Sequence, residues 1–406
     1  MIRKIITLGW KNIWRNPTRS GVVIIAVLLG IWAGVFISAF FNSMAQGYLQ
    51  NQLDLTVGHI QITNPQFGDQ FNPKYNIEEV QSLLDTLAEQ KHIQQIEYES
   101  QSTGLAQSAA NSYGVTIHGV DTTHTSPPPV IQYLKQGDFL QSIDRNPILI
   151  GKALAERLKL DLRSKLVLSF QDVDGNITAG AFRVAGIFDS FNSKYDKRNV
   201  FVLRSDLNRL LGKKDLIHKI TLKLGNFTNA PQQAEQLSGS YPDLKIASWA
   251  AIAPELEYVF SMTDVSMYVV MVIIIIALVF SIINTMLMAV MERTRELGML
   301  MAIGMNKRRL FGMVLSETFF LTMVGTPLGL LFSWITVSIL GTTGIDLSAF
   351  AQGLNAYGME TVIYPKLNAS YYWHITLLIS VAAILSALYP AWKTLKLKPV
   401  EAIRKI

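Results

Sequence analysis

The sequence contains no cysteine, so no disulfide bond stabilises any part of its fold. Charged residues make up only 16% of the 406 positions, against about 25% in an average soluble protein. The chain also lacks a G-x-x-x-x-G-K-[ST] phosphate-binding loop, and its six histidines have no metal-ligand spacing. These absences argue against a disulfide-rich secreted protein and against an enzyme. We predict no catalytic, cofactor-binding or metal-binding residue.

Four long uncharged stretches account for the scarcity of charge. They cover residues 21–41, 265–291, 318–345 and 371–392. Each reaches the roughly 20 residues that a helix needs to cross the bilayer core. Because lipid offers no hydrogen bonds to the backbone, each stretch is best satisfied as a helix. We therefore predict an α-helical membrane domain of four transmembrane helices, with a large domain outside the lipid between the first two.

The net charge of +6 comes from basic residues that gather beside these stretches rather than on a nucleic-acid-binding face. Positive residues flank the cytoplasmic ends of spans. All four spans then agree on one orientation, with both termini and residues 292–310 inside and residues 42–264 and 346–370 outside. The basic residues that support this orientation are Arg3, Lys4, Lys11, Arg15, Arg19, Arg293, Arg295, Lys307, Arg308, Arg309, Lys393, Lys396, Lys398, Arg404 and Lys405.

The large outer segment mixes strand-like and helix-like patterns. Residues 57–63, 115–120 and 165–170 alternate as strands do, and an Asp-Gly pair after the last of these indicates a hairpin into residues 177–188. Residues 152–160 have helical periodicity instead. The segment is therefore predicted to be an α+β domain in at least two lobes.

Three further segments are predicted to be helical. Residues 2–16 place apolar residues at helical spacing with basic residues off that stripe, which is typical of a helix in the headgroup layer. Residues 42–55 and 251–264 would continue the first two spans as helices beyond the membrane. Such continuations would allow motion in the membrane to reach the outer domain.

The inner loop, residues 292–310, mixes charge with an apolar stripe of Leu297, Leu300, Met301 and Gly304. An amphipathic helix on the cytoplasmic side is suited to docking into a groove on another protein. A basic loop that merely obeys the orientation rule is the simpler interpretation, and composition alone favours it.

The same loop carries a family resemblance. It reads Glu292-Arg293-x-Arg295-Glu296-Leu297-Gly298, followed by Ala302-Ile303-Gly304-Met305, and it resembles the FtsX-like, MacB-type ABC transporter permeases. The tail is similar to that family as well, with Tyr389-Pro390-Ala391 followed by residues 397–404. Residues 148–158, 182–188 and 199–207 resemble the periplasmic core of the family. Within the family, the lipoprotein-releasing branch is the most similar.

The resemblance implies a permease that catalyses nothing itself and binds no cofactor, since ATP and Mg²⁺ would be bound by a dimer of separate ATPase subunits. It further implies a bacterial inner-membrane location, a second permease copy or sister permease, surrounding lipids and a periplasmic acceptor. The ten residues quoted from the loop, Glu292 to Met305, would form the segment that couples to the ATPase.

Three functions remain open. The first is extraction of lipoproteins or another amphiphilic substrate from the inner membrane, driven by mechanical transmission to the periplasmic domain. The second is a relay that activates a periplasmic enzyme, and the third is export of peptides or drugs.

The segments predicted from the sequence and the resemblance are a cytoplasmic amphipathic helix (1–20), transmembrane helix 1 (21–41), a periplasmic α+β domain with its stalk (42–264), transmembrane helix 2 (265–291), a cytoplasmic coupling helix (292–310), transmembrane helix 3 (311–345), a periplasmic loop (346–370), transmembrane helix 4 (371–392) and a cytoplasmic tail (393–406).

Glu317 is the only acid within the predicted transmembrane helix 3, residues 311–345. Buried charges in membranes are costly and often functional. Glu317 is expected either to anchor the helix near the interface, paired with Arg308 or Arg309, or to serve in the membrane interface. Gly325, Pro327 and Gly329 in the same segment predict a kink or close helix packing.

Overall fold

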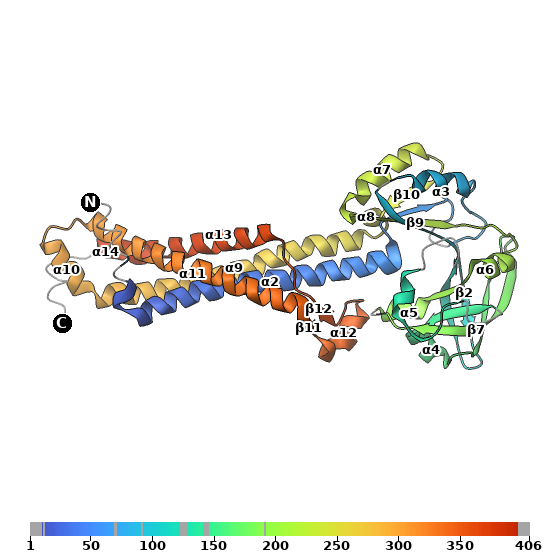
Figure 1. Cartoon of the computed structure of the whole chain (residues 1–406), viewed down its shortest axis with the longest axis horizontal. Coiled ribbons are helices and arrows are strands. Elements are labelled where there is room, and N and C mark those ends of the chain that lie inside the picture. The colour runs from blue at the N-terminus through green and yellow to red at the C-terminus, as the bar shows by residue number, and fades with distance from the viewer. Residues whose placement is uncertain are drawn as a thin grey trace. The chain divides into compact units, whose positions relative to one another are not determined.

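The structure is a computed structural model that describes residue 10 and residues 13–68, 71–90, 92–121, 128–140, 146–190 and 192–396 (Figure 1). These residues form two compact units. The membrane unit comprises the chain up to Ala45, Ser261–Ile345, and the chain from Val362 onward, and the sheet unit comprises Gln46–Phe260 and Asp346–Thr361. The helix predicted for residues 2–16 falls largely outside the described residues, as do the tail residues 397–404.

Among the described residues, four helices are long and apolar enough to cross a membrane, as predicted. They are built on α2 (Pro17–Gln52), α9 (Pro254–Glu292), α11 (Lys307–Thr343) and α13 (Ala369–Ser386), the last continuing into α14 (Leu388–Leu395). The helical continuations predicted for the first two spans are confirmed: α2 ends at Gln52 and leads into the π-helical turn η1 (Leu53–Val57), and α9 begins at Pro254. A short helix, α10 (Thr294–Ala302), lies between α9 and α11.

Glycines bring the membrane helices close together. A Cβ on Gly325 or Gly329 of α11 would stand 3.0 Å from the Cβ of Val27 or Ile31 on α2. Helix α11 continues through Pro327 without a break. The expectations for this segment were a kink or close helix packing, and the short distances confirm close packing. Small residues at these positions let helix backbones approach each other in lipid.

The sheet unit contains a ten-stranded sheet within the described residues. Nine strands follow the order β10-β1-β9-β2-β3-β8-β5-β7-β4, and β6 pairs with β2 and β7. The strands are β1 (Ile60–Thr63), β2 (Ile93–Gln107), β3 (Ser112–Val120), β4 (Leu134–Gly137), β5 (Pro147–Gly151), β6 (Lys165–Gln171), β7 (Ile177–Phe188), β8 (Asn199–Leu203), β9 (Lys219–Leu224) and β10 (Lys245–Ser248).

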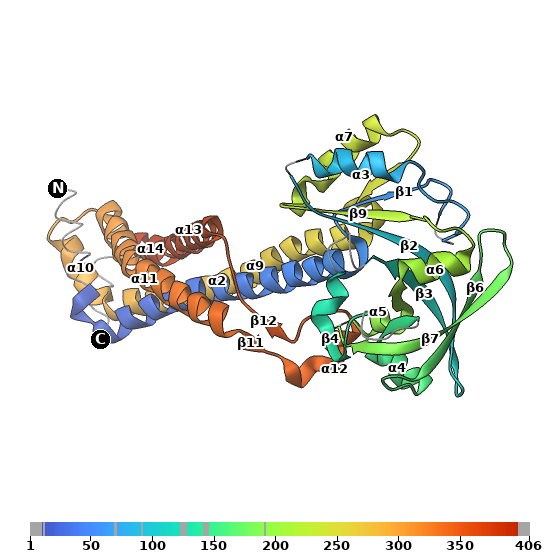
Figure 2. The same cartoon turned by 45° about the vertical axis from the view of Figure 1, so that its right-hand side comes forward.

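Two helical layers cover this sheet, one in each lobe. Helices α3 (Val80–Ala88) and α7 (Ala230–Ser240) pack on β1 and β9 around a core that includes Ile60 and Leu222 (Figure 2). Helices α4 (Lys152–Leu158) and α6 (Arg204–Leu211) enclose a second core with strands β3 and β5 to β8. The remaining short elements are η2 (Pro129–Tyr133), α5 (Ser193–Arg198), η3 (Phe227–Asn229), α8 (Trp249–Ile252), β11 (Ile345–Asp346), η4 (Ser348–Phe350), α12 (Ala351–Ala356) and β12 (Val362–Ile363).

The predicted α+β character in two lobes is confirmed. The hairpin from β6 to β7 turns at Gly175, whose φ of 85° lies in the left-handed region that favours glycine. Strand β1 is shorter than predicted, because Val57 belongs to η1 and Gly58 makes the turn into the strand.

Candidate coupling site

Helix α10 is separated from α9 by a single residue, Arg293, whose backbone leaves the regular helical conformation. Asn306 caps the following helix, since its side chain accepts a hydrogen bond from the backbone N–H of Arg308. The predicted coupling residues are therefore placed on one short helix and on the turns at its two ends.

The ten predicted residues divide between two faces of this segment. Arg293, Leu297 and Gly298 are buried, and Met305 is half-buried. The exposed residues are Glu292, Arg295, Glu296, Ala302, Ile303 and Gly304. A partner protein can therefore reach six of the ten without any change in the fold of the membrane unit.

The apolar stripe that the sequence offered to a partner packs inward instead. Leu297 belongs to the core of the helical bundle, and Leu300 and Met301 pack against that core. Burying these side chains within the chain removes their apolar surface from water without any partner. Of the stripe, only Gly304 is exposed.

A different apolar pair faces outward. Met299 is 46% exposed and Ile303 is 85% exposed. They are four residues apart, so they lie on the same side of the segment. Met299 was not among the residues predicted from the sequence, although its spacing of four residues from Ile303 predicts that the two side chains share a face.

Buried charges fasten α10 to two of the long helices. The Glu317 carboxylate of α11 lies 3.1 Å from the Arg19 guanidinium of α2 and 3.5 Å from the Arg293 guanidinium. Glu317 is 5% exposed and Arg293 is 8% exposed. The anchoring role expected of Glu317 fits this burial, but the expected partners, Arg308 and Arg309, are replaced by Arg19 and Arg293. Arg308 and Arg309 precede Glu317 by more than two helical turns, whereas partners on one helix lie three or four residues apart.

In this cluster two guanidiniums share one buried carboxylate. Arg19 is also 3.7 Å from Glu292, whose side chain is half exposed. The Nε and Nη2 atoms of Arg293 are buried and have no hydrogen-bond partner among the described residues. Removing the buried carboxylate would therefore leave Arg293 without its ion-pair partner and Arg19 with only the half-exposed Glu292.

A second ion pair joins the exposed face of α10 to the start of the chain. Glu296 pairs with Arg15, and both side chains are about half exposed. Surface pairs contribute little stability on their own, typically below about 1 kcal/mol. The Arg15–Glu296 pair therefore orients α10 relative to the start of the chain and contributes little to the free energy of unfolding.

Two family models match the chain. The MacB-like periplasmic core domain matches residues 20–239, and the FtsX-like permease C-terminal model matches residues 268–399. The chain belongs to the MacB-type, FtsX-like family of ABC transporter permeases. The FtsX-like match includes α10, Arg293 and Glu317, whereas Arg15 and Arg19 precede both matched ranges.

Two relatives align with nearly the whole chain. An uncharacterized ABC transporter permease of Methanocaldococcus jannaschii is 22% identical, over 98% of this chain and 97% of that protein. The lipoprotein-releasing system transmembrane protein LolC of Haemophilus influenzae is also 22% identical, over 94% of this chain and 92% of that protein. The crystal structure of the periplasmic region of MacB from Actinobacillus actinomycetemcomitans is 19% identical over 52% of this chain and 97% of that one, with a TM-score of 0.35.

Proposed function

We propose that this permease works with a dimer of separate ABC-type ATPase subunits and extracts lipoproteins, or another amphiphilic substrate, from a bacterial inner membrane. ATP and Mg²⁺ are bound by the ATPase, and the permease itself carries out no chemistry. The single observation that carries the coupling part of this proposal is the buried Arg19–Glu317–Arg293 cluster.

The cluster supports mechanical coupling because it ties the base of α10 to α2 and α11. An ATPase seated on the exposed face of α10 moves that helix when its subunits close on ATP. The buried ion pairs pass this displacement to α2. Helix α2 runs without a break from Pro17 to Gln52 and so extends into the sheet unit. A continuous helix transmits displacement along its axis, since each turn is hydrogen-bonded to the next.

The substrate class rests on similarity to LolC of Haemophilus influenzae, whose name describes a lipoprotein-releasing system and which this chain matches over nearly its whole length. In the orientation proposed here both termini and α10 are cytoplasmic, and the sheet unit is periplasmic, where it meets the acceptor. A second copy of the chain, or a sister permease, completes the membrane domain.

The test is purification of the tagged chain from its native membrane in a mild detergent, with mass spectrometry of the bound proteins. An ABC-type ATPase together with acylated proteins is the expected result. An ATPase accompanied by a cell-wall hydrolase or a channel protein, without lipoproteins, would move the assignment to the relay or the exporter. Absence of any ATPase from the wild-type preparation would contradict the proposal.

The contact surface is tested in the same preparation with Ile303→Glu. This change places a carboxylate on the 85% exposed apolar residue of the coupling segment, and it should abolish recovery of the ATPase while the chain remains folded. Ile177→Glu is the matched control, because Ile177 is 83% exposed at the start of β7 in the sheet unit. Equal recovery of the ATPase with both variants would place the contact elsewhere.

A further inference from the structure

The sheet unit contains a cavity of about 610 Å³, a size typical of small-molecule sites. Its floor is one face of the sheet, and strand alternation explains why that face is polar. Ile60 and Ile62 of β1 turn into the core beneath α3 and α7, whereas Gln61 and Thr63 line the cavity. Strand β9 alternates in the same way.

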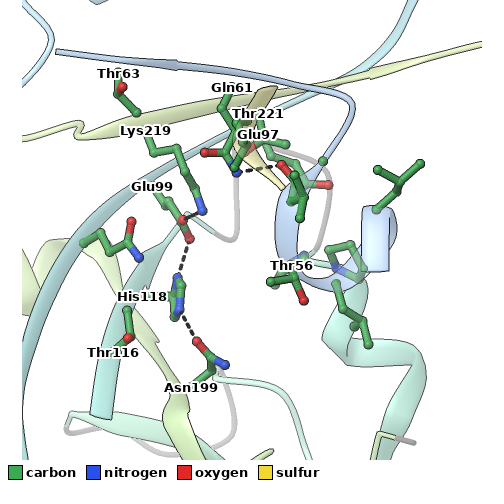
Figure 3. Close-up of a pocket in the computed structure, with 18 of the residues that line it drawn as sticks. Thr56, Gln61, Thr63, Glu97, Glu99, Thr116, His118, Asn199, Lys219 and Thr221 are labelled. Atoms are coloured by element: carbon green, nitrogen blue, oxygen red, sulfur yellow. Dashed lines mark hydrogen bonds and ion pairs between the residues drawn. The ribbon is translucent and has the colours of Figure 1, made fainter. Parts of the chain in front are cut away.

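Three polar residues of this floor lie in one row. Thr221 of β9 is paired with Gln61 of β1 on one side and with Glu97 of β2 on the other. Directly paired residues in a sheet point to the same face. Figure 3 shows the three side chains gathered at one side of the cavity.

The lysines nearest this row are already paired. Lys219 pairs with Glu99, and Lys223 pairs with Asp54. Glu99 also lies 2.9 Å from the Nδ1 atom of His118, which extends the polar floor toward β3 (Figure 3). Among the described residues, no lysine or arginine lies within ion-pair distance of Glu97.

The row presents oxygen atoms that accept hydrogen bonds. The Gln95 amide donates to one carboxylate oxygen of Glu97 at 2.9 Å, which leaves the other oxygen without a described donor. The Gln61 amide nitrogen donates to the backbone oxygen of Val57 at 2.6 Å, so its own amide oxygen remains as an acceptor. The Thr221 hydroxyl has no hydrogen bond to any described residue. Three oxygens on one row match the three N–H donors of a primary ammonium group.

We propose that this cavity binds a small organic ligand that carries a primary ammonium group, with Glu97 as its counter-ion and Gln61 and Thr221 as hydrogen-bond acceptors. The carbon skeleton of the ligand would contact apolar side chains elsewhere in the lining, among them Leu55, Val120 and Phe201. The site lies within the sheet unit and does not depend on which cargo the permease moves.

The electrostatics of Glu97 agree with this assignment. Burial and, to a smaller extent, the nearby charge of Glu99 raise the pKa of Glu97 to about 7, although Lys219 and Lys223 act in the opposite direction. A partly buried carboxylate with no cation at ion-pair distance is costly to ionise. A bound ammonium offsets that cost and adds charge-assisted hydrogen bonds.

The proposal is tested on the full chain in phosphatidylcholine nanodiscs at pH 8, with butylammonium as the probe and saturation-transfer NMR as the readout. Empty nanodiscs supply the background. Saturable binding of butylammonium is expected, with an affinity at least about tenfold above that of butanol, which lacks the charge, and of tetramethylammonium, which lacks the N–H donors.

The variant Glu97→Gln preserves the shape of the side chain and removes the charge, and it should weaken butylammonium binding by about tenfold or more. Thr221→Val should weaken it less. Glu235→Gln, the same change at an exposed position of α7 on the other side of the sheet, should leave binding unaltered. Absence of saturable binding to the wild-type chain, equal binding of butanol, or unchanged binding by Glu97→Gln would each overturn the assignment.

Discussion

The carboxylate of Glu317 lies 3.1 Å from the guanidinium of Arg19, although 298 positions separate the two residues in the chain. The pair joins α11 to α2, and Arg293 joins the same carboxylate from the turn before α10. Three segments that are remote in sequence thus meet at a single buried acid. The coupling proposal rests on this meeting point, because a displacement of α10 would act on α2 and α11 through the same carboxylate.

The cluster predicts a large loss of stability when its acid is neutralised. Glu317→Gln should lower the free energy of unfolding by about 3 kcal/mol, because the buried Arg293 then loses its ion-pair partner and Arg19 keeps only the half-exposed Glu292. Thermal unfolding of the detergent-solubilised chain, followed by tryptophan fluorescence, measures the change. Arg308→Ala removes an exposed charge from the same end of α11 and should have little effect. Equal melting temperatures for Glu317→Gln and the wild type would contradict the structural role of the cluster.

The close approach of α2 and α11 predicts that Gly329 tolerates no larger residue. A side chain at Gly329 meets Ile31, whose Cβ lies 3.0 Å from the position of the new Cβ, so Gly329→Val should push the helices apart. Gly312 lies on the same helix with nothing within 4 Å of its new Cβ, so Gly312→Val is the matched control. A fall in melting temperature is expected for the first variant alone. A similar fall for both would point to helix propensity rather than to packing.

The raised pKa of Glu97 predicts a specific dependence of stability on pH. Its pKa is about 7 in the folded chain, against an ordinary value of 4.5. Between these values the folded state holds one proton more than the unfolded state, so the contribution of Glu97 to stability falls as pH rises from 4.5 to 7. The full loss amounts to at most about 3 kcal/mol.

Glu97→Gln removes this titration. The stability of the variant relative to the wild type should therefore increase as pH rises from about 4.5 to about 7, and should be constant on either side of this range. Chemical unfolding at a series of pH values measures the difference. Glu235→Gln serves as the control at an exposed site. A flat difference curve for Glu97→Gln would show that the carboxylate is not buried as described.

The junction of β5 and α4 predicts a strict requirement for glycine. A Cβ on Gly151 would stand 2.2 Å from the backbone oxygen of Asp196. A backbone atom cannot relieve this clash by changing rotamer, as the end of a flexible side chain could. Gly151→Ala should therefore destabilise the sheet unit by about 3 kcal/mol or more. Gly114→Ala in β3, where nothing lies within 4 Å, should be neutral. Limited proteolysis of both variants distinguishes them, and equal resistance would refute the clash.

The pattern of the sequence was least informative where a strand borders the cavity. Strand β2 runs from Ile93 to Gln107, yet its consecutive residues Ser100, Gln101 and Ser102 are all polar and all buried, which does not resemble a strand with one buried face. Both faces of this region are partly enclosed, one by the core and one by the cavity. Local alternation of apolar and polar residues therefore could not predict it.

The sequence by itself determined the four membrane helices, the α+β domain between the first two and the family of the chain. These properties are local, because a bilayer demands long apolar runs and a hairpin demands particular turn residues. Only the tertiary structure decided that Glu317 pairs with Arg19 and Arg293, that Leu297 turns inward while Ile303 faces out, and that Gln61, Thr221 and Glu97 share a row. Such contacts depend on helix packing and strand register, which join residues far apart in the chain and leave no local periodicity to read.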